Sequence, residues 1–199
     1  GLKEALRKKP MREEGLHRFW LCTELKENYE DSIQFHEELI EKSPYSHLAW
    51  FNLGHAFAGL LQYEKSLEAF EYVIAIDENF DGAYICCGDV LYNMERYNDA
   101  VNYYLDAIKI SKPSKELYLK TAEAYDKLEE YSKSRAYLRK SIVVDPYFDE
   151  AFFCLVETYR SEEKWTKAIS SFERAVKLNK ENTDYLAALA DAYMSVGEG

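Results

Sequence analysis

The stretch that decides the fold is residues 47–80, which read HLAWFNLGHAFAGLLQYEKSLEAFEYVIAIDENF. Large apolar residues recur in both halves at steps of three and four: Trp50, Leu53 and Phe57, then Leu67, Phe70 and Val73. That spacing places them on one face of each of two helices. A break at residues 59–62 separates the two faces, and the small Gly54 lies on the first of them. The stretch is therefore predicted to form an antiparallel helix pair whose helices approach closely at Gly54.

This helix pair is one copy of a unit that recurs with a 34-residue period. Five aromatic residues keep that step: Tyr29, Tyr63, Tyr97, Tyr131 and Trp165. A column of branched aliphatic residues keeps it as well: Ile40, Ile74, Ile108, Ile142 and Val176. A fixed period of this size indicates repeated supersecondary units that bury their apolar faces on one another. We expect the aromatic column to pack at the turn within each helix pair.

The motif within each unit resembles the tetratricopeptide repeat. Trp50-x2-Leu53-Gly54-x2-Phe57, followed by Ser66-x3-Phe70, is similar to that family's 34-residue signature, W-x2-L-G-x2-Y…A-x3-F…P. The resemblance covers essentially the whole chain. It implies an all-α fold, a right-handed α-solenoid of 34-residue helix-turn-helix repeats.

The period predicts a single array over residues 1–199, because no linker or shift in composition divides it. Its expected parts are the tail of a preceding second helix (1–12), five repeats (13–46, 47–80, 81–114, 115–148 and 149–182) and the first helix of a further repeat (183–199). Trp20 is the misfit, since it falls where Gly54 and Gly88 stand in later units and would widen its helix pair. Both ends fall inside repeats. We favour a piece of a longer protein over solitary capping helices, because 183–199 has a poor polar face for a cap.

Composition and charge narrow the class of partner. The chain of 199 residues has 25 Lys and Arg against 36 Asp and Glu, a net charge of −11. Nucleic acid is not an expected partner, because affinity for it rests largely on Lys and Arg. No stretch approaches the ~20 continuous apolar residues that span a bilayer, so no membrane insertion is expected. The four cysteines form no CxxC pair; as free thiols they favour the cytoplasm, and the missing initiator Met leaves open a trimmed N-terminus.

No catalytic constellation is evident, so we expect neither an enzyme nor a cofactor. The sequence lacks a Gly-rich phosphate loop, a nucleophile elbow and a Cys/His pair with an orienting group. His36 occupies the slot of Phe70 in the next unit and is predicted to be a packed core residue. His17 and His55 would approach each other between adjacent units, but no spacing there supports a metal site, and none is predicted.

The family resemblance implies that the first helices line a concave wall where ligands bind. On the face opposite the packing stripe, each unit contributes one mostly apolar residue and, one turn further on, a mostly acidic one. The predicted peptide-binding groove consists of Phe51, His55, Ile85, Asp89, Tyr92, Leu119, Glu123, Asp126, Phe153, Glu157 and Arg160. A row of like charge attracts opposite charge, and apolar positions supply desolvation energy. Two plainer interpretations stay open: the acidic row as ordinary solvation, and the aliphatic members as packing between helices.

The predicted function is a non-enzymatic scaffold for protein–protein interaction that binds a basic and apolar peptide segment of a partner. Two alternatives remain. The chain could be the recruiting or regulatory segment of a larger multidomain protein, or a self-assembly module that forms homo-oligomers through unpaired terminal helices. Within the family, arrays that clamp acidic chaperone tails carry Lys, Asn and Arg on the groove wall. Only Asn52 agrees here, because the other wall positions are His17, Leu21, Gly82 and Cys86; such a clamp is not expected.

Overall fold

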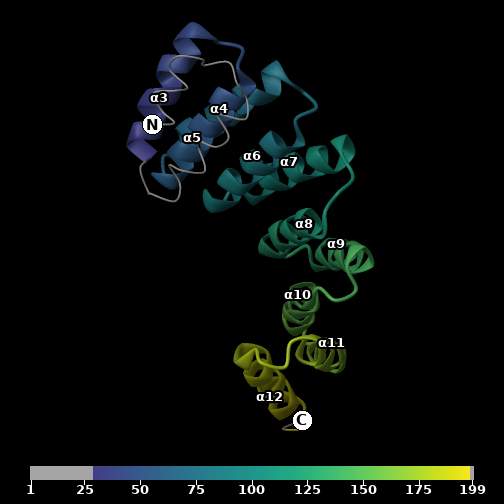
Figure 1. Ribbon diagram of the computed structural model, residues 1–199. Helices are drawn as coiled ribbons and strands as arrows, with labels where there is room; N and C mark the ends of the chain where they lie inside the picture. The colour runs from purple at the N-terminus through teal and green to yellow at the C-terminus, as the bar shows by residue number, and fades with distance from the viewer. Residues whose placement is uncertain (1–28, 198–199) are drawn as a thin grey trace. The chain divides into compact units, whose positions relative to one another are not determined.

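The computed structural model describes residues 29–197, and that range holds ten α-helices and no strand (Figure 1). The helices are α3 (Tyr29–Lys42), α4 (His47–Gly59), α5 (Tyr63–Ile76), α6 (Asp81–Asn93), α7 (Tyr97–Ile110), α8 (Lys115–Lys127), α9 (Tyr131–Val144), α10 (Asp149–Arg160), α11 (Trp165–Leu178) and α12 (Thr183–Gly197). The aromatic column supplies the first residue of each of the second helices α3, α5, α7, α9 and α11. The all-α fold and the 34-residue period are therefore confirmed. The predicted helix tail at 1–12, the start of the 13–46 repeat and Trp20 lie outside the described residues.

The chain forms two compact units, Gly1–Ser111 (unit 1) and Lys112–Gly199 (unit 2). In unit 1, α3 packs on α4, α4 on α5, α5 on α6 and α6 on α7. In unit 2, α8 packs on α9, α9 on α10, α10 on α11 and α11 on α12. Within each unit every helix thus lies beside its neighbours in sequence, as expected for stacked helix pairs (Figure 1). A single array over residues 1–199 stays a prediction.

In unit 1 a glycine on each of the first helices α4 and α6 faces a large ring on the second helix of its pair. A Cβ atom added at Gly54 would lie 2.6 Å from the ring of Phe70, and one added at Gly88 would lie 2.4 Å from the ring of Tyr104. Both distances are too short for a real contact, so the close approach predicted at Gly54 is confirmed. In unit 2 the same position holds Ala122 and Val156, which are fully buried in clusters with Leu138 and Phe172.

The turn within the helix pair has the same backbone in four repeats. One residue in each turn is left-handed: Leu61, Glu95, Glu129 and Glu163, with φ between 57° and 60°. The next amide donates to the carbonyl five residues earlier, as from Gln62 to Phe57 at 2.9 Å. This pattern is the Schellman motif that closes helix C-termini. It fixes the direction of the chain just before the aromatic residue that begins the second helix.

Candidate functional site

In unit 1 the predicted wall residues lie on α4 and α6. The unit 1 wall consists of Phe51, His55, Ile85, Asp89 and Tyr92, all of them half-buried. The rings of Phe51 and His55, one turn apart on α4, meet edge to face at 4.5 Å between centroids. Phe51 also contacts the ring of Phe80 at 5.0 Å. The apolar part of this wall is therefore held rigidly by aromatic packing.

A Cys–His contact joins α4 to α6 in the middle of the unit 1 wall. Sγ of Cys86 lies 3.7 Å from Nε2 of His55, and the hydroxyl of Tyr104 donates to the Asp89 carboxylate at 2.8 Å. Burial lowers the pKa of His55 to about 4, although the negative charge of Asp89 opposes that shift. The imidazole is therefore neutral at pH 7 and does not stabilise a thiolate. The pair is a wall contact rather than an activated nucleophile.

In unit 2 the predicted wall residues lie on α8 and α10. The unit 2 wall consists of Leu119, Glu123, Asp126, Phe153, Glu157 and Arg160. Leu119 is only 6% exposed and packs in the core with Leu138 and Leu155, so it offers little accessible apolar surface. Phe153 is half-buried, and its ring stacks on that of Tyr185 at 4.9 Å.

The carboxylates of the unit 2 wall are crowded. Burial raises the pKa of Glu123, and the charges of Glu150 and Asp126 raise it further against partial compensation by nearby lysines. Burial likewise raises the pKa of Asp126; the charge of Lys127 opposes this shift, and that of Glu157 adds to it. Oδ1 of Asp126 is buried and has no hydrogen-bond partner. Arg160 donates to Glu157 at 2.9 Å, but that pair is exposed. Glu123 and Asp126 therefore ionise less readily than exposed carboxylates do.

Two further residues belong to the unit 2 wall although sequence reasoning did not select them. Burial raises the pKa of the Cys154 thiol, and the charges of Glu123 and Glu150 contribute next. Cys154 and Glu150 are therefore neighbours of the predicted acidic row. Both lie on α10 within one turn of Phe153. Their positions could have been found by extending the wall pattern to the neighbouring positions on either side.

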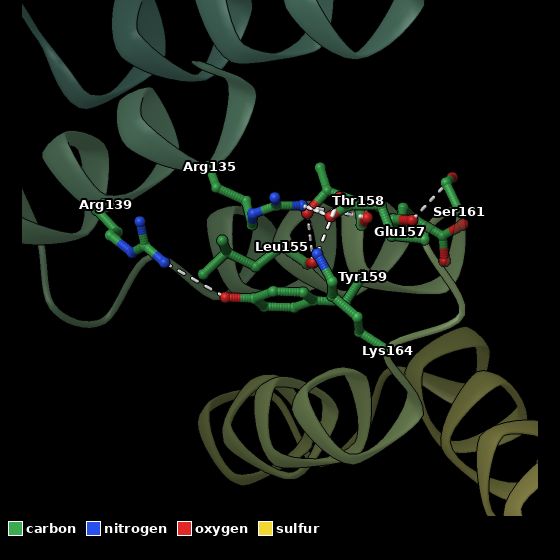
Figure 2. Close-up of polar contacts among 9 residues, drawn as sticks. Arg135, Arg139, Leu155, Glu157, Thr158, Tyr159, Ser161 and Lys164 are labelled. Carbon is green, nitrogen blue, oxygen red and sulfur yellow. Dashed lines mark hydrogen bonds and ion pairs between the residues drawn. The ribbon is translucent and has the colours of Figure 1, made fainter. Parts of the chain in front are cut away.

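A buried cation joins α9 to the end of α10 (Figure 2). Arg135 is 8% exposed and stands in the column that Leu67 and Ile169 occupy in other repeats. Its guanidinium donates to the Thr158 carbonyl at 3.4 Å and to the Glu162 carboxylate, and it lies 5.0 Å from the centre of the Tyr159 ring. It therefore satisfies a carbonyl of the last turn of α10. The sequence indicates this cluster only through the presence of a charged residue in an otherwise apolar column.

The described residues offer no site for a metal ion in the form of three or more clustered His, Cys, Asp or Glu side chains. Over the same range, no helix has the length and apolar character needed to cross a membrane.

Comparisons with known proteins agree with this fold. Models of the tetratricopeptide repeat match residues 47–80, 88–147 and 153–184, together well over half of the chain. No curated protein matches the sequence significantly. Many solved structures resemble it, among them those of YrrB, MamA and PilW.

The three structures share the fold at low identity. YrrB, described as a TPR protein with an unusual peptide-binding site, is 16% identical with a TM-score of 0.76, covering 94% of this chain and 97% of its own. MamA of Desulfovibrio magneticus RS-1 is 17% identical with a TM-score of 0.77, covering 85% and 96%. PilW, a type IV pilus biogenesis factor, is 18% identical with a TM-score of 0.79, covering 93% and 86%.

Proposed function

Because this chain belongs to the tetratricopeptide repeat family, we propose that it is a scaffold whose first helices bind a peptide segment of a partner protein. The segment carries Lys or Arg among apolar residues. The repeats and the structural neighbours support protein interaction as the general role. The peptide-binding site named for YrrB supports a peptide as the class of ligand.

One observation carries the choice of a basic ligand: the crowding of carboxylates on the unit 2 wall. Glu123 and Asp126 both have raised pKa values because burial and neighbouring negative charges disfavour their ionised forms. A cationic side chain placed between them would relieve this repulsion and give the buried Oδ1 of Asp126 a donor. The arrangement therefore favours Lys or Arg over a neutral or acidic ligand residue.

The aromatic members of both walls support the apolar half of the proposal. Phe51, Tyr92 and Phe153 are half-buried beside their acidic neighbours and are held in place by other rings. Rigid aromatic side chains bury area at low entropic cost, and such residues often dominate binding energy. A ligand with alternating apolar residues would cover them while its cations meet the carboxylates.

The test uses two short fluorescent peptides of the same pattern. One alternates Lys with Leu and the other alternates Glu with Leu, and binding is followed by fluorescence anisotropy. We expect the Lys peptide to bind in preference. The variant Glu123→Gln/Asp126→Asn/Glu157→Gln should lower its affinity at least about tenfold, because it removes three charges from the unit 2 wall.

The matched control removes the same number of charges from exposed positions of unit 2 that carry no wall residue, Glu129→Gln/Glu163→Gln/Glu181→Gln. It should keep the affinity within about twofold, since only long-range attraction is lost. Equal affinity for both peptides, or equal losses in the two variants, would rule the proposal out.

We further infer that the chain acts without catalysis of its own, either alone or as the recruiting segment of a larger protein. Cys86, Cys87 and Cys154 form no disulfide with one another. Free thiols fit a reducing compartment, which supports the cytoplasm as the location of the protein.

A further inference from the structure

Several cations converge on one tyrosine at the joint of α9, α10 and α11. Tyr159 of α10 has Arg135 of α9 at 5.0 Å and Lys167 of α11 at 6.0 Å from its ring centre. Its hydroxyl accepts a hydrogen bond from Arg139 of α9 at 3.3 Å (Figure 2). Tyr159 thus holds cations from two successive second helices close together.

Negative charge at this joint is small. Glu162 pairs with both Arg135 and Lys164, and no salt bridge is present for Arg139 or Lys167 among the described residues. The α9 sequence YSKSRAYLRKSIVV contains four cations and no carboxylate, and α11 contains three cations and one carboxylate. The second helices α9 and α11 of unit 2 are therefore basic although the chain as a whole carries a charge of −11.

The cations lie beside exposed apolar side chains. Lys140 rests 4.3 Å from the ring centre of Tyr137, which orders its long chain. Val143 and Tyr147, at the end of α9 and in the loop after it, are 81% and 76% exposed. We define the outer basic face by its exposed members Arg139, Lys140, Val143, Tyr147, Lys167, Arg174 and Lys177. A face that combines cations with exposed apolar side chains is complementary to a protein surface that carries carboxylates and apolar groups.

The column of Arg139 carries the opposite charge in two second helices of unit 1. Arg139 of α9 corresponds to Glu37 of α3 and Glu71 of α5, three and two periods earlier, whereas α7 has Leu105 at this position. The sequence of α3 contains five carboxylates and one cation, and that of α5 contains three and one. We define the outer acidic face by its exposed members Glu37, Glu41, Tyr45, Glu64, Glu68 and Tyr72. Like the basic face, it combines one sign of charge with exposed apolar groups.

We propose that the outer basic face of unit 2 in one copy of the chain binds the outer acidic face of unit 1 in a second copy. The two faces are complementary in charge, and each includes an exposed tyrosine that can cover apolar surface of the other. Contact between unlike faces is heterologous, so the association can continue from copy to copy. The opposite charge of α3 and α5 on one side and of α9 and α11 on the other is the reason for choosing a second copy over nucleic acid or an anionic membrane.

The association should depend on salt, because the opposed charges are exposed. Sedimentation velocity on the whole chain measures this directly. Raising NaCl from about 0.02 M to about 0.5 M should weaken the association more than tenfold. Association through the exposed apolar side chains of α12, such as Tyr193 and Met194, would resist salt, so the same experiment separates the two surfaces.

A charge exchange tests the pairing of the faces. Variant one, Arg139→Glu/Lys167→Glu/Arg174→Glu, makes both faces acidic, and variant two, Glu37→Lys/Glu41→Lys/Glu68→Lys, makes both basic. Each variant alone should lose at least about tenfold in association at low salt, and an equimolar mixture of the two should regain it. Circular dichroism checks that both remain helical.

A monomer at low salt would overturn the proposal, even if the chain then bound anionic vesicles or nucleic acid through the same cations. A mixture of the two variants that stays dissociated would overturn it as well. None of the substituted residues belongs to the unit 1 or unit 2 wall, so the result is independent of peptide binding.

Discussion

At the residue scale, Arg135 is the position where this chain departs furthest from its own pattern. The column that it occupies is otherwise apolar, with Leu67 and Ile169 as its counterparts. A buried cation is retained at little cost only when its hydrogen bonds are made, and here a carbonyl, a carboxylate and a ring surround it (Figure 2). The joint between α9 and α10 therefore depends on a polar cluster where other repeats depend on apolar packing.

Removing this cation should destabilise unit 2. Arg135→Ala leaves the Thr158 carbonyl without its side-chain donor and opens a cavity, so we expect a loss of about 2–3 kcal/mol in unfolding free energy. Arg135→Leu, which restores the apolar column, should cost markedly less. Urea unfolding followed by circular dichroism compares the two. An Arg135→Leu variant as unstable as Arg135→Ala would contradict the view that apolar packing can replace the cluster.

The left-handed turn residues offer a stabilising change. Glu129 has φ 58° at the end of α8, a conformation that costs a residue with a Cβ atom about 1 kcal/mol and costs glycine little. Glu129→Gly should therefore raise the unfolding free energy by about 0.5–1 kcal/mol. Ala136→Gly, on the exposed side of α9, is the control and should lower it by about 1 kcal/mol. The urea concentration at the midpoint of unfolding measures both effects. A midpoint that falls in both variants would contradict the prediction for Glu129→Gly.

At the element scale, the period alone located the helices well. The aromatic column fell on the first residues of the second helices, because a constant repeat length leaves each turn the same length. The period also predicted the positions of Gly54 and Gly88. Each lies opposite a large ring of the second helix, where a side chain with a Cβ atom would clash. The helix starts and the positions of the glycines depend only on spacing along the chain, and this spacing can be read directly from the sequence.

The composition of the candidate walls was less accessible to sequence. The contact between Cys86 and His55 and the burial of Leu119 depend on how far one first helix is displaced along the next. A period states which positions are equivalent but not how neighbouring units are offset. The partner of Arg135 could not be predicted for a related reason: Glu162 lies in a turn, and only the close approach of α9 to α10 brings it within reach.

The crowded carboxylates of the unit 2 wall predict a conflict between stability and binding. Their raised pKa values mean that ionisation is less favourable in the folded chain than in the unfolded one. Glu123→Gln/Asp126→Asn should therefore stabilise the free protein at pH 7, by about 0.5 kcal/mol after screening by solvent, while weakening binding of the Lys peptide. Thermal unfolding and anisotropy measured on the same variant check both halves. A variant that is less stable and binds as before would refute the prediction.

At the scale of the whole molecule, the two units differ in the groups that titrate near neutrality. The last of the four histidines along the chain is His55, so unit 2 has none. In unit 1, His36 is fully buried, with Nδ1 2.8 Å from the Ser32 carbonyl and Nε2 3.3 Å from the Asn52 amide nitrogen. That geometry fits a neutral ring that donates from Nδ1 and accepts at Nε2. Its place in the core, as predicted from the slot of Phe70, is confirmed.

These differences predict opposite responses of the two units to mild acid. Burial lowers the pKa of His36 and of His55 to about 4, whereas the unfolded chain protonates near 6.5. Between those values the unfolded state binds more protons, so the stability of unit 1 falls as pH drops through this window, by up to about 3 kcal/mol for His36. The raised pKa values of Glu123 and Asp126 act in the other direction, because the folded state of unit 2 then binds more protons. Hydrogen exchange at pH 7 and pH 5.5, corrected for intrinsic rates, should show α3 and α4 losing protection while α8 and α10 keep or gain it.

The variant His36→Phe isolates the contribution of His36 to the pH response. Phenylalanine fits this position, because the equivalent residues of two other repeats are Phe70 and Phe172. The change removes an acceptor from the Asn52 amide and should cost some stability at every pH. It should also reduce the loss of protection in α3 and α4 between pH 7 and pH 5.5, since the ring that must accept a proton is gone. His47→Gln is the control: His47 is the first residue of α4 and is not fully buried, and its replacement should leave the pH response of unit 1 intact. An unchanged pH response in His36→Phe would mean that acid acts on unit 1 through groups other than His36. Protection lost equally in both units of the natural chain would mean that acid acts through groups other than the buried histidines.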